Sequence, residues 1–445
     1  MSLRIIPIGG FNEVGKNMVL VDLGEDAIIL DAGFYLPAIA SLQESERVYS
    51  EKKFRAIGAI PDDTILDRLG LKEKVRAIIP SHAHLDHIGA IPYIANRYKA
   101  DIISTPFTIE LIKTLLNEEK IYLKNRLISV LPNNSYYVKG KNRNYKVDFI
   151  NITHSTIHSS LVAIHSPEGI ILYSNDFKLD DNPILGQKPN YEKIKEISRE
   201  GVKLLICDSL YACDERKTAS EKVARTMLQD VLLSTDSHNQ GLIVTTFSSH
   251  IARLKSIVDF GLKLNRKIIF MGRSLAKYTN SAARVNSCPF IRDIEIVTFR
   301  NHLERKLKQI SKEREKYMIV CTGHQGEPGS ILDRITRNKL HYQLNKNDHV
   351  VFSSSVIPTQ INIDNRNLLD ARLKKRGVRI FNNIHVSGHA GREDIRDFIN
   401  LVSPEHIIPA HGPHEKTQPL IELGKELGYK QKFLHLTSNH EQILI

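Results

Sequence analysis

The stretch Ser81-His82-Ala83-His84-Leu85-Asp86-His87 decides the fold, and it directly follows an apolar segment, 76–80, that predicts a buried strand. In an extended segment His82, His84 and Asp86 point to one side, and His87 comes at the start of the helix expected next. Four such ligands within six residues are more than a single ion needs, and imidazole with carboxylate suits zinc-like metals. The stretch therefore predicts a metal site at the end of a strand.

Strands and helices alternate on both sides of this stretch, which indicates an α/β fold. Before it, short apolar segments at 3–8, 17–23 and 26–31 are separated by glycine-rich turns and predict a β-meander. After it, a helix is expected over 88–99. The alternation continues to the C-terminus, with further helices expected at 108–119, 191–200, 218–234, 250–262, 273–285, 300–316, 359–376, 391–402 and 415–427.

The composition is that of an ordinary globular protein. Of 445 residues 41% are hydrophobic and 25% charged, and 62 Lys+Arg against 50 Asp+Glu give a net charge of +12. The four cysteines form no C-x-x-C pair, which argues against a disulfide framework or a thiolate metal site and favours a reducing, cytoplasmic location. No apolar run is long enough to span a bilayer, so no membrane partner is expected.

The quoted stretch resembles the signature of the metallo-β-lactamase superfamily, and the rest of that pattern can be followed along the chain. The family's early aspartate is matched by Asp31 in Leu-Asp-Ala-Gly, and its next ligand by His154 in Asn-Ile-Thr-His. Its metal-bridging aspartate is matched by Asp176, and its final histidine by His411 in Pro-Ala-His-Gly. Each of these residues falls at the end of a predicted strand.

The resemblance implies a centre of two metal ions. One ion would be held by His82, His84 and His154, the other by Asp86, His87 and His411, with Asp176 bridging the two. Asp31 would accept an N–H from a ligand histidine and fix its tautomer. Two Zn²⁺ ions per chain are expected, with Mn²⁺ as a substitute, and such a pair stabilises both the attacking and the leaving oxygen of a phosphoryl displacement.

A long segment separates the last two ligands, because His411 follows Asp176 by 234 positions. Within and around it, Asp208 in Cys-Asp-Ser-Leu and His389 in His-Val-Ser-Gly-His-Ala resemble the first two added motifs of the β-CASP nucleases, with His411 as the third. The expected architecture is a metallo-β-lactamase αββα sandwich, 1–208 and 377–445, interrupted by an α/β β-CASP domain at 209–376.

Further stretches resemble ribonuclease J, namely Cys321-Thr-Gly-His-Gln-Gly-Glu-Pro, Phe352-Ser-Ser-Ser-Val-Ile-Pro and the opening Ile6-Pro-Ile-Gly-Gly-Phe-Asn-Glu-Val-Gly-Lys-Asn-Met. The similarity covers essentially the whole chain, and the end soon after His411 is similar to the shorter, archaeal members of that family. Two residues depart from the family pattern: His158, and His324 where serine is usual. Neither stands at a ligand position.

The resemblance also implies roles beyond the metals. Asp208 and His389 would protonate the leaving 3′-oxygen, since a carboxylate raises the pKa of a neighbouring imidazole; Asp86 is counted with them as catalytic. Ordinary turn capping is the competing explanation of Asp208. The positions that match the family's 5′-monophosphate pocket are Ser248, Ser249, His385, Ser387, Gly388 and His389. Ser248 and Ser249 are equally well explained as a helix N-cap before Ile251.

The implied function is that of a 5′–3′ exoribonuclease that acts on single-stranded RNA, prefers 5′-monophosphate ends and releases nucleoside monophosphates. The alternative is a β-CASP endoribonuclease of the mRNA 3′-end processing type, and homodimerisation is expected only because related enzymes dimerise. The charge distribution agrees with an RNA partner. Residues 209–376 hold 29 Lys+Arg and 16 Asp+Glu, a net charge of +13, whereas the remaining residues hold 33 and 34, a net charge of −1.

Overall fold

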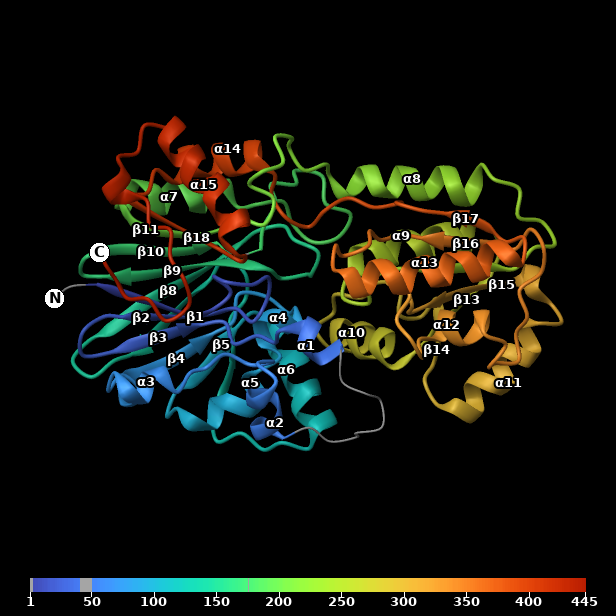
Figure 1. Cartoon of the computed structure of the whole chain (residues 1–445), viewed down its shortest axis with the longest axis horizontal. Helices are drawn as coiled ribbons and strands as arrows, with labels where there is room; N and C mark the ends of the chain where they lie inside the picture. The colour runs from blue at the N-terminus through green and yellow to red at the C-terminus, as the bar shows by residue number, and fades with distance from the viewer. Residues whose placement is uncertain (1–2, 41–49, 175) are drawn as a thin grey trace. The chain divides into compact units, whose positions relative to one another are not determined.

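The structure, a computed structural model, describes residues 3–40, 50–174 and 176–445. The chain forms two compact units (Figure 1). The first unit is discontinuous and consists of Met1–Asp181, Gln187–Thr218 and Gly388–Ile445, whereas the inserted unit consists of Asn182–Gly186 and Ala219–Ser387. The domain boundaries expected from the sequence, at 208/209 and 376/377, stay a prediction. None of the helices in the described ranges is long and apolar enough to cross a membrane.

Two sheets form the first unit, one of seven strands in the order β19-β1-β2-β3-β4-β5-β6 and one of six in the order β18-β11-β10-β9-β8-β7. The strands of the first sheet are β1 (Arg4–Gly9), β2 (Met18–Asp22), β3 (Ala27–Leu30), β4 (Val75–Ile79), β5 (Asp101–Ser104), β6 (Leu127–Ser129) and β19 (Ile443–Leu444). Those of the second are β7 (Ser135–Lys139), β8 (Asn144–Asn151), β9 (Ser160–Ser166), β10 (Gly169–Ser174), β11 (Val202–Asp208) and β18 (His406–Ala410). The predicted β-meander corresponds to β1, β2 and β3, which pair antiparallel.

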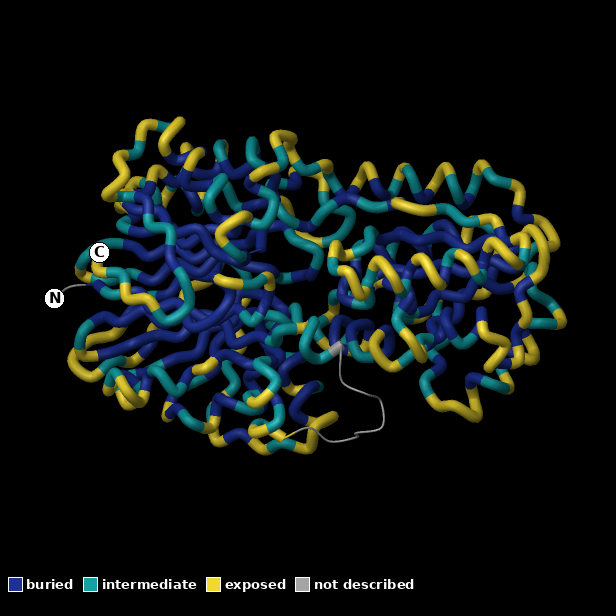
Figure 2. The backbone as a smooth tube through the Cα atoms, viewed as in Figure 1, coloured by how far each residue is buried: buried dark blue, intermediate teal, exposed yellow. Residues whose placement is uncertain are grey.

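Two apolar cores arise because successive residues of a strand face opposite sides of its sheet. In β8, Phe149 packs into the core shared by the two sheets, whereas Ile150 packs into a second core beneath helices. Leu204 and Leu205 of β11 divide in the same way. Strands buried on both faces read as continuous apolar runs, and they form the dark blue interior of this unit in Figure 2.

Helices cover both outer faces of the paired sheets, which confirms the expected αββα sandwich (Figure 1). The second core is closed by α7 (Tyr191–Glu200), α14 (Arg392–Val402) and α15 (His414–Glu426). On the other side α6 (Pro106–Glu119) packs against β5 and β6.

The inserted unit is a separate α/β layer. Its six strands stand in the order β14-β13-β15-β12-β16-β17, and every pairing is parallel. The chain leaves β12 toward β13 on one side and leaves β15 toward β16 on the other, so the carboxyl ends of β12 and β15 form a topological switch point, where open parallel sheets bind ligands. The elements are β12 (Leu242–Thr245), β13 (Lys267–Met271), β14 (Ile294–Val297), β15 (Tyr317–Cys321), β16 (His349–Phe352), β17 (Arg379–Phe381), α8 (Glu221–Leu233), α9 (Ile251–Lys263), α10 (Arg273–Arg284), α11 (Arg300–Ile310), α12 (Ile331–Thr336) and α13 (Gln360–Lys375).

The single helix predicted over 88–99 is wrong in its extent. α4 (Leu85–Ile88) ends before Gly89, and α5 (Ile91–Ile94) is followed by a 3-10 turn at Ala95–Arg97. At Gly89 the backbone comes so close to Phe34 that a Cβ would lie 2.2 Å from its ring. A proline in the first turn of α5 supplies no N–H, which suits a helix start better than a helix interior.

Candidate metal centre

The predicted metal ligands come from strands whose carboxyl ends meet at one edge of the first unit. β10, β11 and β18 are mutually parallel, and β8 runs in the same direction because it pairs antiparallel with β9, which pairs antiparallel with β10. In the other sheet β3 and β4 are parallel. The loops after β4, β8, β10 and β18 therefore present their side chains to a shared space.

Three site residues that follow strands have left-handed backbone conformations. The φ angles are 57° at Asp31, 53° at Asp176 and 67° at His411. Such conformations cost about 1–3 kcal/mol for a residue with a Cβ, and they persist where the surrounding structure fixes them, often at functional sites. These backbone conformations therefore occur at residues that the sequence predicts to belong to the metal site.

One group of ligand atoms contains three imidazole nitrogens. His84 Nδ1 lies 3.1 Å from His82 Nε2 and 3.1 Å from His154 Nε2. Asp176 Oδ2 lies 3.4 Å from His82 Nε2 and 3.6 Å from His154 Nε2. Ligand atoms of a tetrahedral zinc site are roughly 3.3 Å apart, given metal–nitrogen distances of about 2.0–2.1 Å. The spacing of these four side chains therefore fits one four-coordinate divalent ion.

A second group consists of Asp86, His87, His411 and the shared Asp176. His87 Nε2 lies 3.3 Å from Asp176 Oδ2 and 3.6 Å from Asp86 Oδ2, and His411 Nε2 lies 3.9 Å from Asp86 Oδ2. Asp176 Oδ1 is buried and has no hydrogen-bond partner within the described ranges. A buried carboxylate oxygen without a donor is costly, and a cation would satisfy it. The structure thus fits a pair of ions that share Asp176.

Two of the predicted ligand histidines are hydrogen-bonded through the ring nitrogen that faces away from the other ligand atoms. His87 Nδ1 donates to Asp31 Oδ2 at 2.7 Å. The Asp31 carboxylate also accepts from the Tyr173 hydroxyl at 2.6 Å and from the Ser81 N–H at 2.7 Å. His154 Nδ1 donates to the Gly388 carbonyl at 2.8 Å. Such partners fix the tautomer that leaves the other nitrogen available to a metal.

Asn17 is a further contact that the sequence did not reveal. Its Oδ1 accepts from His411 Nδ1 at 3.0 Å, and its Nδ2 lies 3.1 Å from both His87 Nε2 and the Asp86 carbonyl. The side chain is buried. Asn17 lies in the opening Gly-Lys-Asn-Met motif, so the motif carried the signal even though no role had been assigned to it.

Electrostatics favour metal-binding protonation states in the first ligand group and at Asp176, but not at His87. Burial and the neighbouring His82 hold the pKa of His84 and of His154 well below the usual range, so both imidazoles are neutral. Burial acts against ionisation of Asp176, but His411 and His87 outweigh it and hold the pKa of that carboxyl well below its ordinary value. Neutral imidazoles and ionised carboxylates are the forms that bind divalent metals. Burial lowers the pKa of His87, but the neighbouring carboxylates, Asp176 foremost, outweigh it and raise that pKa well above the usual range, so His87 must release a proton to bind a metal.

Asp208 and His389 are hydrogen-bonded to each other close to Asp176. His389 Nδ1 donates to Asp208 Oδ2 at 2.8 Å, and His389 Nε2 lies 4.0 Å from Asp176 Oδ2. Burial lowers the pKa of His389, but the Asp208 and Asp176 carboxylates outweigh it and raise that pKa to about 9. Asp208 Oδ1 also accepts from the Leu210 N–H at 2.9 Å, so the carboxylate caps its turn as well as binding the imidazole.

The residues predicted for a 5′-monophosphate pocket are divided between the units, and the pocket stays a prediction. The inserted unit contains Ser248, Ser249, His385 and Ser387, and the first unit contains Gly388 and His389. The N-cap expected at Ser248 and Ser249 is wrong, because α9 is capped by His250, whose side chain accepts from the Arg253 N–H. The ring of Phe247, the residue before Ser248, packs against the rings of His324 and His385. The distances between ring centroids are 4.4 Å and 5.9 Å.

The two departures from the family pattern lie outside the metal-ligand groups found in the described ranges. His158 has a φ of 58°, its carbonyl accepts from the Thr105 hydroxyl at 2.7 Å, and burial lowers its pKa. His324 is buried against Phe247 in the inserted unit, at the carboxyl end of β15.

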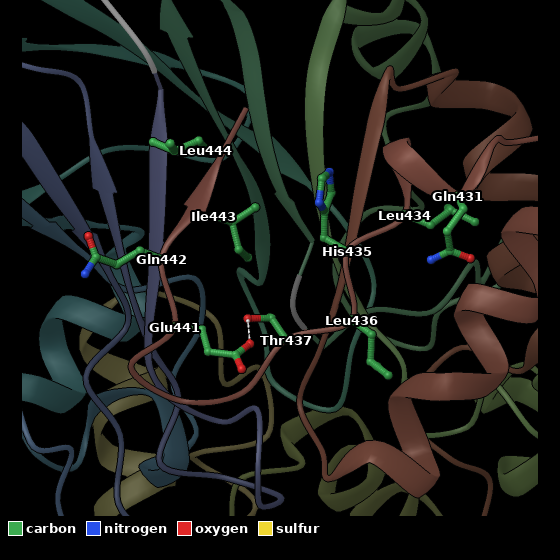
Figure 3. A pocket seen from close by; sticks show the side chains of 9 residues that line it. All are labelled: Gln431, Leu434, His435, Leu436, Thr437, Glu441, Gln442, Ile443 and Leu444. Atoms are coloured by element: carbon green, nitrogen blue, oxygen red, sulfur yellow. Dashed lines mark hydrogen bonds between the residues drawn. The ribbon is translucent and has the colours of Figure 1, made fainter.

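A cavity of about 570 Å³ lies along the C-terminal segment, away from the ligand groups (Figure 3). That segment joins the two sheets, because Leu434 bridges to Ile407 of β18 and β19 pairs with β1. The lining of the cavity contains none of the predicted site residues. It consists of Gln431, Leu434, His435, Leu436, Thr437, Glu441, Gln442, Ile443 and Leu444.

His435 in this lining makes the fold sensitive to acid. Its Nε2 lies 2.9 Å from His406 Nδ1, and burial together with His406 lowers the pKa of His435 to about 4. The unfolded chain, with a histidine pKa of about 6.5, takes up the proton first, so stability is full above that pH and falls as pH drops toward 4. The whole shift corresponds to about 3 kcal/mol, which solvent screening of the partly exposed ring reduces to about 1 kcal/mol.

We therefore expect the free energy of unfolding in urea to fall less between pH 7 and pH 5 in a His435→Asn variant than in the parent. His238→Asn, at an exposed histidine of the inserted unit, is the matched control and should leave the pH slope unchanged. Equal slopes for the parent and the His435→Asn variant would contradict the assignment.

Comparison with known proteins covers nearly the whole chain. Residues 12–199 match the metallo-beta-lactamase superfamily, 239–368 the ribonuclease J beta-CASP domain, and 375–434 the Zn-dependent metallo-hydrolase RNA specificity domain. The ribonuclease J of Methanocaldococcus jannaschii is 42% identical over 444 residues, which are 99% of this chain and 98% of that protein. The ribonuclease J of Pyrococcus abyssi is 41% identical over 430 residues, which are 96% and 93% of the two chains. A crystal structure of a protein of unknown function from Enterococcus faecalis V583 shares the fold, with a TM-score of 0.65, 16% identity and full coverage of both chains.

Proposed function

The chain belongs to the ribonuclease J family, and from that membership we propose that it is a two-metal ribonuclease that degrades single-stranded RNA from the 5′ end. The observation that carries the proposal is the pair of ligand groups that share Asp176. We also propose a preference for 5′-monophosphate ends, release of nucleoside monophosphates, a cytoplasmic location and a homodimer.

The metals are proposed to be two Zn²⁺ ions, with Mn²⁺ as a substitute, because three imidazoles with one carboxylate form a donor set typical of zinc. His82, His84 and His154 would hold one ion, Asp86, His87 and His411 the other, and Asp176 both. When bound, the pair supplies positive charge to the phosphate and to the attacking and leaving oxygens. Asp31, Asn17 and the Gly388 carbonyl keep the ligand histidines in the required tautomers.

We propose that His389 gives a proton to the leaving 3′-oxygen of the RNA. Asp208 holds the Nδ1 side of the ring and so leaves Nε2 to act as the acid. The raised pKa of about 9 refers to a centre without ions, and nearby cations lower it toward neutrality because positive charges disfavour imidazolium. An acid with a pKa near the working pH is protonated and still able to transfer its proton.

The charge of the inserted unit supports an RNA substrate. The printed sequence of this unit contains 28 Lys+Arg and 14 Asp+Glu, a net charge of +14, and the rest of the chain has a net charge of −2. The switch point at β12 and β15 lies where parallel sheets place their ligands, and Phe247, Ser248 and Ser249 follow β12 there. Not every basic residue serves RNA, because Arg266 is buried and donates to the carbonyls of Ser237 and Tyr317.

The direct test uses purified protein with Zn²⁺ or Mn²⁺ and three RNAs of one sequence, with a 5′-monophosphate, with a 5′-triphosphate, and circular. We expect mononucleotides to be released from the linear monophosphorylated RNA in preference to the other two. Cleavage of the circle would support the endoribonuclease alternative instead. Activity that survives in an Asp86→Ala/His87→Ala variant would overturn the metal assignment.

RNA binding is expected to weaken steeply with salt. For contacts to about six phosphates, the slope for a single strand of about −0.7 per contact gives an affinity that is roughly 300-fold weaker at 200 mM than at 50 mM salt. Arg273→Gln, an exposed change at the carboxyl end of β13, should weaken binding and reduce the magnitude of the slope by about 0.7. Lys267→Gln, an exposed change at the opposite end of the same strand, is the control and should leave the slope unchanged. Fluorescence anisotropy measures the affinity and its dependence on salt. Equal effects of the Arg273 and Lys267 substitutions would place the RNA elsewhere.

A further inference from the structure

The chain leaves the first unit after Thr218 and returns to it at Gly388, and the two flanking segments run side by side within that unit. Tyr211 and Gly391 form a parallel β-bridge, and the Arg392 N–H donates to the Asp214 carbonyl at 2.7 Å. The approach is so close that a Cβ on Gly391 would lie 2.1 Å from the Arg216 carbonyl oxygen. Side chains between these segments can therefore fix one against the other.

Thr218 makes three hydrogen bonds across this junction. Its hydroxyl donates to the His389 carbonyl at 2.6 Å and accepts from the Gly391 N–H at 3.0 Å. Its own N–H donates to Asp394 Oδ2 at 2.6 Å, and Asp394 is a buried residue in the first turn of α14. One residue thus anchors the backbone of the returning segment at two points and ties it to a helix of the first unit.

The segment that Thr218 anchors carries two functions of the proposed site. The Gly388 carbonyl accepts from His154 Nδ1, and the next residue, His389, supplies the imidazole that binds Asp208. The fit is tight at Gly388, where a Cβ would lie 2.1 Å from Ser155 Oγ and 3.1 Å from the His154 ring. A small displacement of this backbone would therefore move both the partner of a metal ligand and the proposed acid.

We propose that Thr218 is a positioning residue for the metal centre. Its hydroxyl acts as donor and acceptor at once and so fixes the backbone of 388–391, through which it orients His154 and His389. It is not one of the candidate metal ligands, and it acts through the residues that it positions. Its effect on turnover rests on the proposed function, whereas its effect on metal affinity does not.

The test compares Thr218→Val, which keeps the shape but loses the hydroxyl, with Thr218→Ser, which keeps the hydroxyl. The matched control is Thr226→Val, because Thr226 is exposed on α8 and its hydroxyl likewise donates to a carbonyl, that of Lys222, at 3.1 Å. Two quantities are measured: kcat and KM on 5′-monophosphorylated RNA, and the affinity of the metal-stripped protein for Zn²⁺ in competition with a chelator.

We expect Thr218→Val to lower kcat and Zn²⁺ affinity by about 10- to 100-fold, as loss of an outer partner of a metal site does, with KM within about twofold of the parent. Thr218→Ser should recover most of both quantities, and Thr226→Val should change neither. If Thr218→Val does not fold, Thr218→Ala carries the same comparison.

The proposal is overturned if Thr218→Val keeps the parental kcat and Zn²⁺ affinity, or if Thr218→Ser is as impaired as Thr218→Val, since bulk and not the hydroxyl would then matter. An impaired Thr226→Val would show a general effect of threonine removal and also overturn it. If the parent protein cleaves no RNA, the proposed function fails, and the Zn²⁺ measurements still decide the role of Thr218.

Discussion

An Asp176→Asn variant is expected to lose activity on RNA by at least about 10⁴-fold, equivalent to about 5.5 kcal/mol of transition-state stabilisation, and to bind fewer metal ions than the parent. The physical reason is that one carboxylate serves both ligand groups. Asp176 Oδ2 lies 3.4 Å from His82 Nε2 of one group and 3.3 Å from His87 Nε2 of the other. An amide keeps the shape and removes the negative charge that offsets two cations.

Metal content by mass spectrometry of the native protein and turnover of 5′-monophosphorylated RNA test this expectation together. Asp62→Asn is the matched control, because Asp62 lies outside both ligand groups with a side chain that is 52% exposed. The control should retain full activity and metal content. Parental metal content with lost activity would make Asp176 a catalytic group and not a bridging ligand. Retained activity would exclude it from the centre altogether.

The second large effect is expected at the pair formed by Asp208 and His389. His389→Gln should lower kcat by about 10²- to 10⁴-fold, the usual contribution of a general acid, while the content of metal ions stays close to that of the parent. Asp208→Asn should follow in the same direction, because an amide can no longer stabilise the imidazolium through the 2.8 Å contact at Nδ1. The metal ligands are untouched by either change.

A modified substrate separates acid catalysis from simple damage to the site. In an RNA whose leaving 3′-oxygen is replaced by sulfur, the leaving group departs as a thiolate. A thiolate needs little help from an acid because thiols have a pKa of about 8.5. On that substrate the kcat of the His389→Gln variant should lie within about tenfold of that of the parent. A deficit of the same size on both substrates would mean that His389 acts by binding or by shaping the site. His414→Gln, at an exposed histidine outside the ligand groups, should behave like the parent on both substrates.

The residues that the structure brings together as candidate metal ligands could be selected from sequence because imidazole and carboxylate side chains stand where strands end. Imidazole and carboxylate side chains rarely cluster without a purpose, so His82, His84 and Asp86 stood out together, and the family resemblance, which the comparisons confirm, supplied His154 and His411. The αββα sandwich followed from the family resemblance, whereas the alternation of apolar segments indicated only an α/β fold. The apolar segments and the histidine-rich stretch are local signals, each readable within a dozen residues.

The groups that support the ligands could not be predicted, because their partners are set only by the tertiary fold. Asn17 contacts residues 70 and 394 positions away, and although it lies in a motif of the family resemblance, its neighbours in sequence do not reveal these partners. The Gly388 contact is made by a backbone carbonyl, which no residue type reveals. The division of the predicted helix into two short helices likewise depends on the fold, and at Gly89 between them Phe34, far away in sequence, leaves no room for a Cβ.

The junction at Thr218 and Gly391 has a consequence for how such a chain can be rearranged. Because the outgoing and returning segments are hydrogen-bonded to each other, the cut ends of the first unit stand almost at contact. A linker of a few residues is therefore long enough to close this unit on itself, and closing so short a loop costs little entropy. The long segment Ala219–Ser387 of the inserted unit enters and leaves at this junction, so natural recombination or a protein engineer can exchange it for another module without rerouting the strands that carry the proposed ligands.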